Sequence, residues 1–174
     1  ERDITFRGQT LVQGLDPERK VALTPDGEIP FDLFLGIPKH HAPSVVVDAG
    51  LTEDGWIPVD SLTLETRFPG VYAVGDVTSV GTPKAGVFAE GQAVVVADRI
   101  IAQVRGEEGP TYGGVGVCYL EVGGGQVAGV EVTFLQGQPP VGTFQGASDE
   151  LAATKGEFGS SRIQRWFGKD WTNH

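Results

Sequence analysis

The sequence predicts a mixed α/β fold, which has the character of an α+β protein over these 174 residues. Short apolar runs bounded by Gly, Pro and Asp indicate strands, above all at residues 71–74. Apolar residues recur with helical spacing over residues 85–104, which indicates one long helix. The chain also contains 26 Gly and 11 Pro, more than average usage, and this composition indicates many tight turns.

The composition is that of a globular chain with a negative charge. Hydrophobic residues make up 40% of it and the formal net charge is −10. That charge argues against a nucleic-acid partner, because no basic patch is present to displace phosphate counterions. No run of 18 apolar residues occurs, so we expect no transmembrane segment. The chain contains no Met and starts at Glu1, so we expect a processed chain or a piece of a longer protein.

The first 36 residues predict a small antiparallel meander, because short apolar runs alternate with turn residues. The predicted strands lie at residues 4–6, 10–12 and 20–23. A buried strand is then predicted at residues 31–35, and residues 45–47 extend or follow it.

The segment between these last two runs contains two adjacent histidines, His40 and His41, flanked by Pro38 and Pro43. The prolines favour an extended loop. Adjacent residues on an extended chain point to opposite sides, and no Cys or further His lies nearby in the sequence. We therefore expect a surface or cofactor-facing loop and no metal site.

The residues after the long helix predict a hairpin and a closing helix. The long helix should end at Gly106. Strands are predicted at residues 118–122 and 127–135, joined by three consecutive glycines. Ser148 is a candidate N-cap for a final helix that reaches Phe167, with a break near Gly159.

The most specific motif is T-R-F-P-G-V-Y-A-V-G-D, at residues 66–76. Its predicted strand ends in Gly75-Asp76, and the long helix follows a few residues later, so one carboxylate lies where open α/β sheets bind ligands. Gly75 allows close approach of the backbone, and Asp76 can accept hydrogen bonds from hydroxyl groups. The alternative is a plain strand-to-helix turn in which Asp76 serves as a cap.

The motif resembles the second flavin-binding motif of the two-dinucleotide-binding-domain flavoproteins, the family of the pyridine nucleotide–disulfide oxidoreductases. The resemblance implies that Gly75 and Asp76 bind FAD, with Asp76 on the ribityl chain. It also implies that Lys84, Ala85 and Gly86, which open the long helix, stabilise the reduced flavin. A helix N-terminus favours negative charge, which agrees with that role. The alternative for Lys84 is a solvated lysine at a helix start.

Further residues are similar to the sulfide:quinone oxidoreductase and flavocytochrome c sulfide dehydrogenase branch of this family. The similar segments are residues 31–33, 37–38, 42–43, 83–86, 89–93, 157–161 and 165–168. The resemblance implies three parts. They are the end of a second, NAD-like nucleotide-binding domain at residues 1–50, the C-terminal portion of the FAD-binding domain at 51–106, and a C-terminal hairpin-plus-helix domain at 107–174.

Cys118 is the single cysteine of the chain. Relatives in this branch carry redox-active cysteines near the flavin, one of them in the C-terminal region, so the resemblance implies a catalytic role for Cys118. A redox pair needs a second sulfur, which this chain does not contain. The alternative is a small, buried residue in a strand.

The resemblance as a whole implies an FAD-dependent oxidoreductase that passes electrons from a small-molecule donor, such as sulfide, to a quinone-like acceptor. No Gly-rich fingerprint for the FAD pyrophosphate occurs, so we expect the isolated chain to be inactive and to hold little FAD. Two alternatives remain open. One is an NAD(P)H-dependent reductase or NADH:quinone dehydrogenase, and the other is a non-catalytic dimerisation or assembly domain.

We also expect a homo-oligomer and a cytoplasmic or peripheral membrane location. The membrane expectation rests on the aromatic residues Trp166, Phe167 and Trp171, which have basic neighbours. Packing onto the core or a dimer contact is the alternative for these aromatics.

Overall fold

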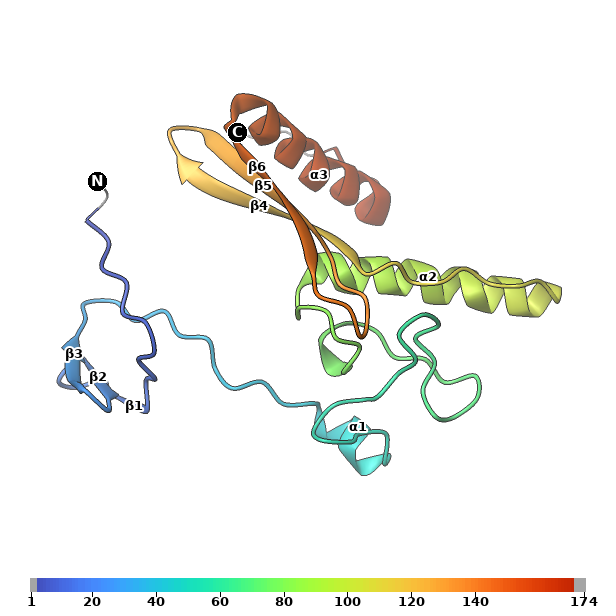
Figure 1. Ribbon diagram of the computed structural model, residues 1–174, viewed down its shortest axis with the longest axis horizontal. Coiled ribbons are helices and arrows are strands. Elements are labelled where there is room, and N and C mark those ends of the chain that lie inside the picture. The colour runs from blue at the N-terminus through green and yellow to red at the C-terminus, as the bar shows by residue number, and fades with distance from the viewer. Residues whose placement is uncertain (1–2, 171–174) are drawn as a thin grey trace. The chain divides into compact units, whose positions relative to one another are not determined.

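The computed structural model describes residues 3–170, which fall into two compact units with a boundary between His40 and His41. Each unit contains one antiparallel three-stranded sheet, and the second unit also contains the helices (Figure 1). Antiparallel sheets combined with helices make an α+β fold, so the predicted fold class is confirmed.

The first unit is a meander of β1 (Gly14–Asp16), β2 (Val21–Thr24) and β3 (Gly27–Pro30), in that spatial order. The first turn forms because the Asp16 carboxylate accepts hydrogen bonds from the two backbone amides at residues 18 and 19. The predicted strands at residues 4–6 and 10–12 are wrong, because neither run pairs with a neighbouring strand in this unit.

Two predicted strands at the join between the units are also wrong. Residues 31–35 form no strand, and Leu33 and Leu35 are largely exposed. Residues 45–47 lie in a short helix, α1 (Ser44–Asp48), which begins directly after Pro43. The β-branched side chains favour a strand only where a pleated neighbour is present to pack against, and no described strand pairs with this segment.

The core of the second unit contains Leu64, Val80 and Tyr112. The segments around it are irregular and are joined by isolated bridges, Ile57 to Thr78 in parallel and Glu65 to Tyr72 antiparallel. The predicted buried strand at residues 71–74 is therefore wrong as a strand. A parallel strand is stable when neighbours flank it, and within residues 3–170 this segment makes only the single bridge at Tyr72.

The long predicted helix is confirmed as α2 (Gly86–Arg105). It buries Phe88 and Gln92, which lie one turn apart. It ends at Gly106, which caps the helix in the left-handed conformation with a φ of 71°.

The remaining residues form β4 (Val115–Gly123), β5 (Gln126–Thr133), β6 (Val141–Ser148) and α3 (Asp149–Phe167). The hairpin of β4 and β5 is confirmed, whereas β6 is an additional edge strand. Helix α3 lies along one face of this sheet (Figure 1). The Ser148 cap is confirmed by its side chain, which accepts a hydrogen bond from the Leu151 amide at 3.1 Å. The predicted break near Gly159 is wrong, because α3 is continuous there.

Candidate functional site

The predicted flavin motif ends in a single 3-10 turn, η1 (Gly75–Val77). The Gly75 carbonyl accepts hydrogen bonds from the amide of Thr78 at 3.1 Å and from its hydroxyl at 2.9 Å, so the turn is closed by its own residues. Asp76 lies in the turn and is exposed. Within residues 3–170 its carboxylate accepts no hydrogen bond, so both oxygens remain available to a ligand.

Gly75 is required by the geometry of this turn. Its φ is 75°, and a Cβ at this position would lie 3.2 Å from the Cβ of Ala89 on α2. The positive φ strains any L-residue, and a Cβ at this position would make a tighter contact with Ala89 than Cβ atoms ordinarily make. The turn is thus packed directly against α2.

Gln92 is the main site residue that sequence reasoning missed. Its side chain is 1% exposed, and its Oε1 accepts a hydrogen bond from the Gly75 amide at 2.6 Å. Its Nε2 donates to the Thr82 hydroxyl at 3.2 Å. The available signal is its position four residues after Phe88, on the apolar face of the helix, where a polar side chain needs partners.

Lys84 is folded back onto the turn that precedes it. Its Nζ donates to the carbonyl of Thr78 at 3.1 Å and to the carbonyl of Asp76, and it lies 3.5 Å from the centre of the Trp56 ring. Burial lowers the pKa of the Lys84 ammonium, and the nearby Asp76 charge opposes that change. The positive charge is therefore held between η1 and Trp56.

Helix α2 begins without a side-chain cap. Ala85 is its N-cap residue, in an extended conformation, and no side-chain hydrogen bond reaches the first turn. The first amide groups of a helix have no partner inside it, and the helix dipole adds positive potential at the same point. The Ala85 amide donates to the Pro83 carbonyl at 3.0 Å, so the Gly86 amide is the first at this helix start that a negative group can use.

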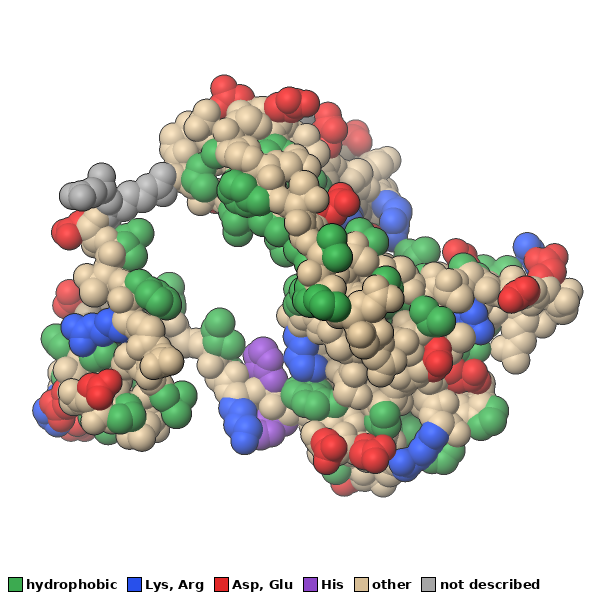
Figure 2. Space-filling model, in the orientation of Figure 1, with side chains coloured by type: hydrophobic (Ala, Val, Ile, Leu, Met, Phe, Trp, Pro, Cys, Tyr) green, Lys and Arg blue, Asp and Glu red, His purple; other side chains and the backbone are tan. Residues whose placement is uncertain are grey.

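Cys118 lies on β4, opposite Val130 of β5, and its side chain is exposed. The alternative of a buried small residue is therefore wrong. Its neighbour Tyr119 contacts Phe158 of α3, with ring centres 5.4 Å apart, so Cys118 lies on the sheet face away from α3. Figure 2 shows hydrophobic side chains over this sheet. The structure groups Gly75, Asp76 and the helix start together, and it places Cys118 on a separate element.

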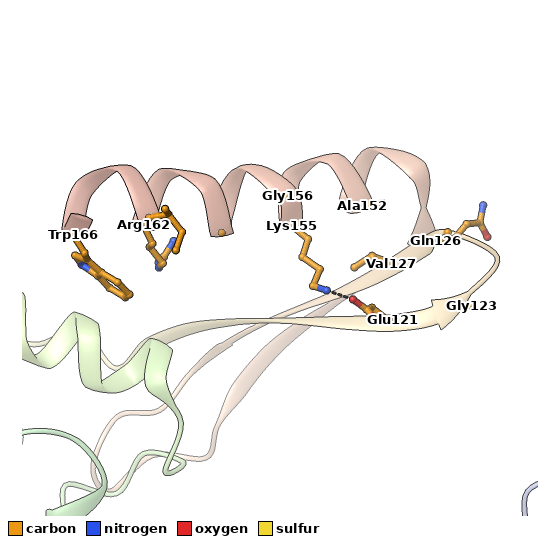
Figure 3. Close-up of a pocket in the computed structure, with 12 residues that line it drawn as sticks. Glu121, Gly123, Gln126, Val127, Ala152, Lys155, Gly156, Arg162 and Trp166 are labelled. Carbon is orange, nitrogen blue, oxygen red and sulfur yellow. Dashed lines mark hydrogen bonds and ion pairs between the residues drawn. The ribbon is translucent and has the colours of Figure 1, made fainter. Parts of the chain in front are cut away.

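A cavity of about 670 Å³ lies between α3 and the hairpin of β4 and β5 (Figure 3). An ion pair of Lys155 with Glu121 spans it, and Trp166 borders one end. Arg162 also lines it, but its Nε donates to Glu90 of α2 at 2.8 Å. Both cations of the cavity are thus already paired. Trp171, the other predicted aromatic of this region, lies outside the described residues.

The structure contains no recognisable metal centre within residues 3–170, where no group of three His, Cys, Asp or Glu side chains could hold an ion. His40 and His41 are both exposed (purple in Figure 2). None of the helices in this part of the chain is long and apolar enough to cross a membrane.

Comparison with known proteins finds similarity to an oxidoreductase. No protein-family model matches the sequence. The chain is 31% identical over 142 residues to a mitochondrial sulfide:quinone oxidoreductase of Schizosaccharomyces pombe. The match includes 77% of this chain but 30% of that protein, so the chain spans less than a third of its relative's length. The similarity supports the resemblance of the motif residues to the sulfide:quinone oxidoreductase branch.

Proposed function

We propose that this chain is the C-terminal part of an FAD-dependent oxidoreductase similar to sulfide:quinone oxidoreductase. The observation that carries the proposal is the 31% identity over 77% of the chain to the Schizosaccharomyces pombe enzyme. In the whole protein, a donor such as sulfide reduces the flavin, and a quinone or another acceptor removes the electrons. The alignment favours this function over the NAD(P)H-dependent reductase and over a non-catalytic assembly domain.

The residues around η1 fit one end of FAD. The Asp76 carboxylate is exposed and accepts no hydrogen bond within the described chain, so it can accept those of ribityl hydroxyl groups. The uncapped Gly86 amide and the positive end of the α2 dipole suit the edge of the flavin ring that becomes negative on reduction. FAD, when bound, supplies the electron-transfer chemistry, and the protein supplies orientation and electrostatics.

Lys84 contributes to this site in two ways. Its two hydrogen bonds to backbone carbonyls hold η1 against the start of α2, and its charge adds to the positive potential of the helix end. Both effects favour an anionic ligand at the same place.

Cys118 is the proposed catalytic thiol. Its exposure leaves the Sγ atom accessible to a second sulfur or to a sulfide-derived substrate. Since this chain contains one cysteine, the second sulfur of a redox pair must come from elsewhere in the whole protein.

The test uses the full protein that contains this chain. The purified protein should show the visible absorbance bands of flavin. Sulfide should bleach these bands in the absence of oxygen, and a quinone should restore them. Asp76→Ala should lower FAD affinity about tenfold, because a charged hydrogen-bond acceptor is lost. The matched control is Asp98→Ala, an exposed carboxylate on α2, which should leave FAD binding unchanged. A colourless full protein contradicts the proposal, and bleaching by NADH but not by sulfide supports the NAD(P)H-dependent alternative.

A further inference from the structure

Gln92 is the most deeply buried polar side chain beside the candidate site, with 1% exposure. Both ends of its amide are used, since the oxygen accepts from Gly75 and the nitrogen donates to Thr82. A buried side chain that joins α2 to two separate points of the preceding loop restricts how that loop can move against the helix.

The hydrogen bond to Gly75 acts at the point where the turn is also sterically confined. The Gly75 backbone has a φ of 75° and lies close to Ala89 of α2, since a Cβ added at Gly75 would lie 3.2 Å from the Ala89 Cβ. The bond of 2.6 Å from its amide to Gln92 keeps it from moving away. Asp76 is the next residue, so its position relative to the start of α2 depends on this contact.

Lys84 restrains the same turn from the other end. It donates to the carbonyl groups of Asp76 and Thr78, whereas Gln92 accepts from the amide of Gly75. The two side chains therefore bind different groups of the turn. Water does not reach the hydrogen bond between Gln92 and Gly75, because the Gln92 side chain is buried.

We propose that Gln92 is a positioning residue for flavin binding, which acts through the Gly75 amide to place Asp76 opposite the uncapped start of α2. The inference rests on the proposed function. A ligand that contacts both Asp76 and the helix start gains binding free energy from both contacts only when the spacing between them is fixed. A small displacement of one binding group weakens the binding of the whole ligand.

The experiment compares two substitutions in the full protein. Gln92→Leu introduces an apolar side chain of similar size and removes both hydrogen bonds. Gln92→Glu keeps an oxygen that can accept from Gly75 and loses the donor to Thr82. Gln92→Leu should lower FAD affinity about tenfold, and Gln92→Glu should lower it less, because the contact to Gly75 survives.

This order of FAD affinities distinguishes a positioning role of Gln92 from a role in core packing alone. A role in core packing alone favours Leu over a buried carboxyl group, so it predicts the reverse order. Amide hydrogen exchange at Gly75 gives a second readout, which should become faster in Gln92→Leu than in Gln92→Glu. The matched control is Gln103→Leu, an exposed glutamine on the same helix, which should change neither FAD affinity nor exchange at Gly75.

The outcomes distinguish this inference from the proposed function. If the unmodified protein binds flavin and Gln92→Leu binds it as well as Gln92→Glu does, the positioning role is wrong and the proposed function stands. If the unmodified protein binds no flavin, both are wrong. Unchanged exchange at Gly75 in Gln92→Leu contradicts the positioning role by itself.

Discussion

The two long helices of this protein end alike and begin differently. Helices α2 and α3 both end at a glycine in the left-handed conformation, Gly106 and Gly168. Helix α3 starts with a Ser148 cap and two acidic residues in its first turn, whereas α2 starts with Ala85, no side-chain cap and no acidic residue. The start of α3 is therefore satisfied by its own side chains, and the start of α2 is left for another group.

The segments that lead into these helices differ as well. Strand β6 runs directly into α3, so backbone pairing sets the entry of the chain. Helix α2 is entered through η1, which Gln92 and Lys84 hold by hydrogen bonds to its backbone. Helix α3 is stabilised at its start without such an arrangement, by Ser148 and the two acidic residues of its first turn. The contrast supports the proposed binding role of the α2 start.

The largest effect is expected from Gly75→Ala. The new methyl group adopts an unfavourable φ and meets Ala89 at 3.2 Å, so the free energy of unfolding should fall by about 2 kcal/mol, and the full protein should lose flavin. Chemical denaturation and flavin absorbance measure the two effects.

The control is Gly70→Ala, which has a similar φ of 76° but open space around it, so it isolates the backbone strain. Gly75→Ala should be the more destabilising of the two. The reverse order would show that contact with α2 is unimportant.

A cap added to α2 should make its start resemble that of α3. Ala85 already has the extended conformation of an N-cap, so Ala85→Asp should raise the free energy of unfolding by about 1 kcal/mol. It should also weaken FAD binding about tenfold in the full protein, because the new carboxylate occupies the amides that the ligand uses.

Ala85→Ser tests the contribution of charge, since serine caps without an anion. It should stabilise the chain and weaken FAD binding less than aspartate does. Stronger FAD binding in Ala85→Asp would contradict the comparison of the two helix starts.

Removal of the α3 cap should change stability in the opposite direction by a similar amount. Ser148→Ala removes the acceptor for the Leu151 amide and should lower the free energy of unfolding by about 1 kcal/mol. Flavin binding should be unchanged. Ser161→Ala, at an exposed serine inside α3, is the control and should change stability little. Loss of flavin in Ser148→Ala would show that the two helix starts are coupled.

The helices and the caps could be predicted from the sequence because their determinants are local. Apolar spacing over α2, Gly106 at its end and Ser148 before α3 act within a few residues of one another. The predicted strand at residues 71–74 depended instead on parallel neighbours, which residues 3–170 do not provide. Strand β6 was missed because it is an edge strand with no alternation of buried and exposed positions.

The candidate site could be predicted only in part for the same reason. The Gly75-Asp76 turn and the helix start at Gly86 lie in one continuous segment, whose residues formed a recognisable motif. Gln92 was missed because its partners, Gly75 and Thr82, are 17 and 10 residues away along the chain. The Lys84 contact with Trp56 likewise joins distant segments, and composition and periodicity do not report such contacts.

The smallest predicted effect concerns pH and the charge of Lys84 beside the α2 start. Burial lowers the pKa of Lys84 in the folded chain below its usual value. At alkaline pH between the folded and the unfolded pKa, the unfolded chain therefore binds more protons than the folded one. The contribution of Lys84 to the free energy of unfolding therefore rises as pH increases through this window. FAD affinity should fall a few-fold over the same window, because deprotonation removes a positive charge from the site.

Lys84→Arg tests whether the charge of residue 84 causes stability to rise and FAD affinity to fall with increasing pH. Arginine remains charged at these pH values, so both slopes should be weaker in this variant, whereas Lys39→Arg, at an exposed loop lysine, should keep them. Denaturation and FAD titration across the alkaline range measure the two slopes. If FAD affinity rises with pH in the unmodified protein, Lys84 does not act on the ligand by its charge. Its role is then to hold η1 through the Asp76 and Thr78 carbonyls, and the uncapped helix start supplies the positive potential alone.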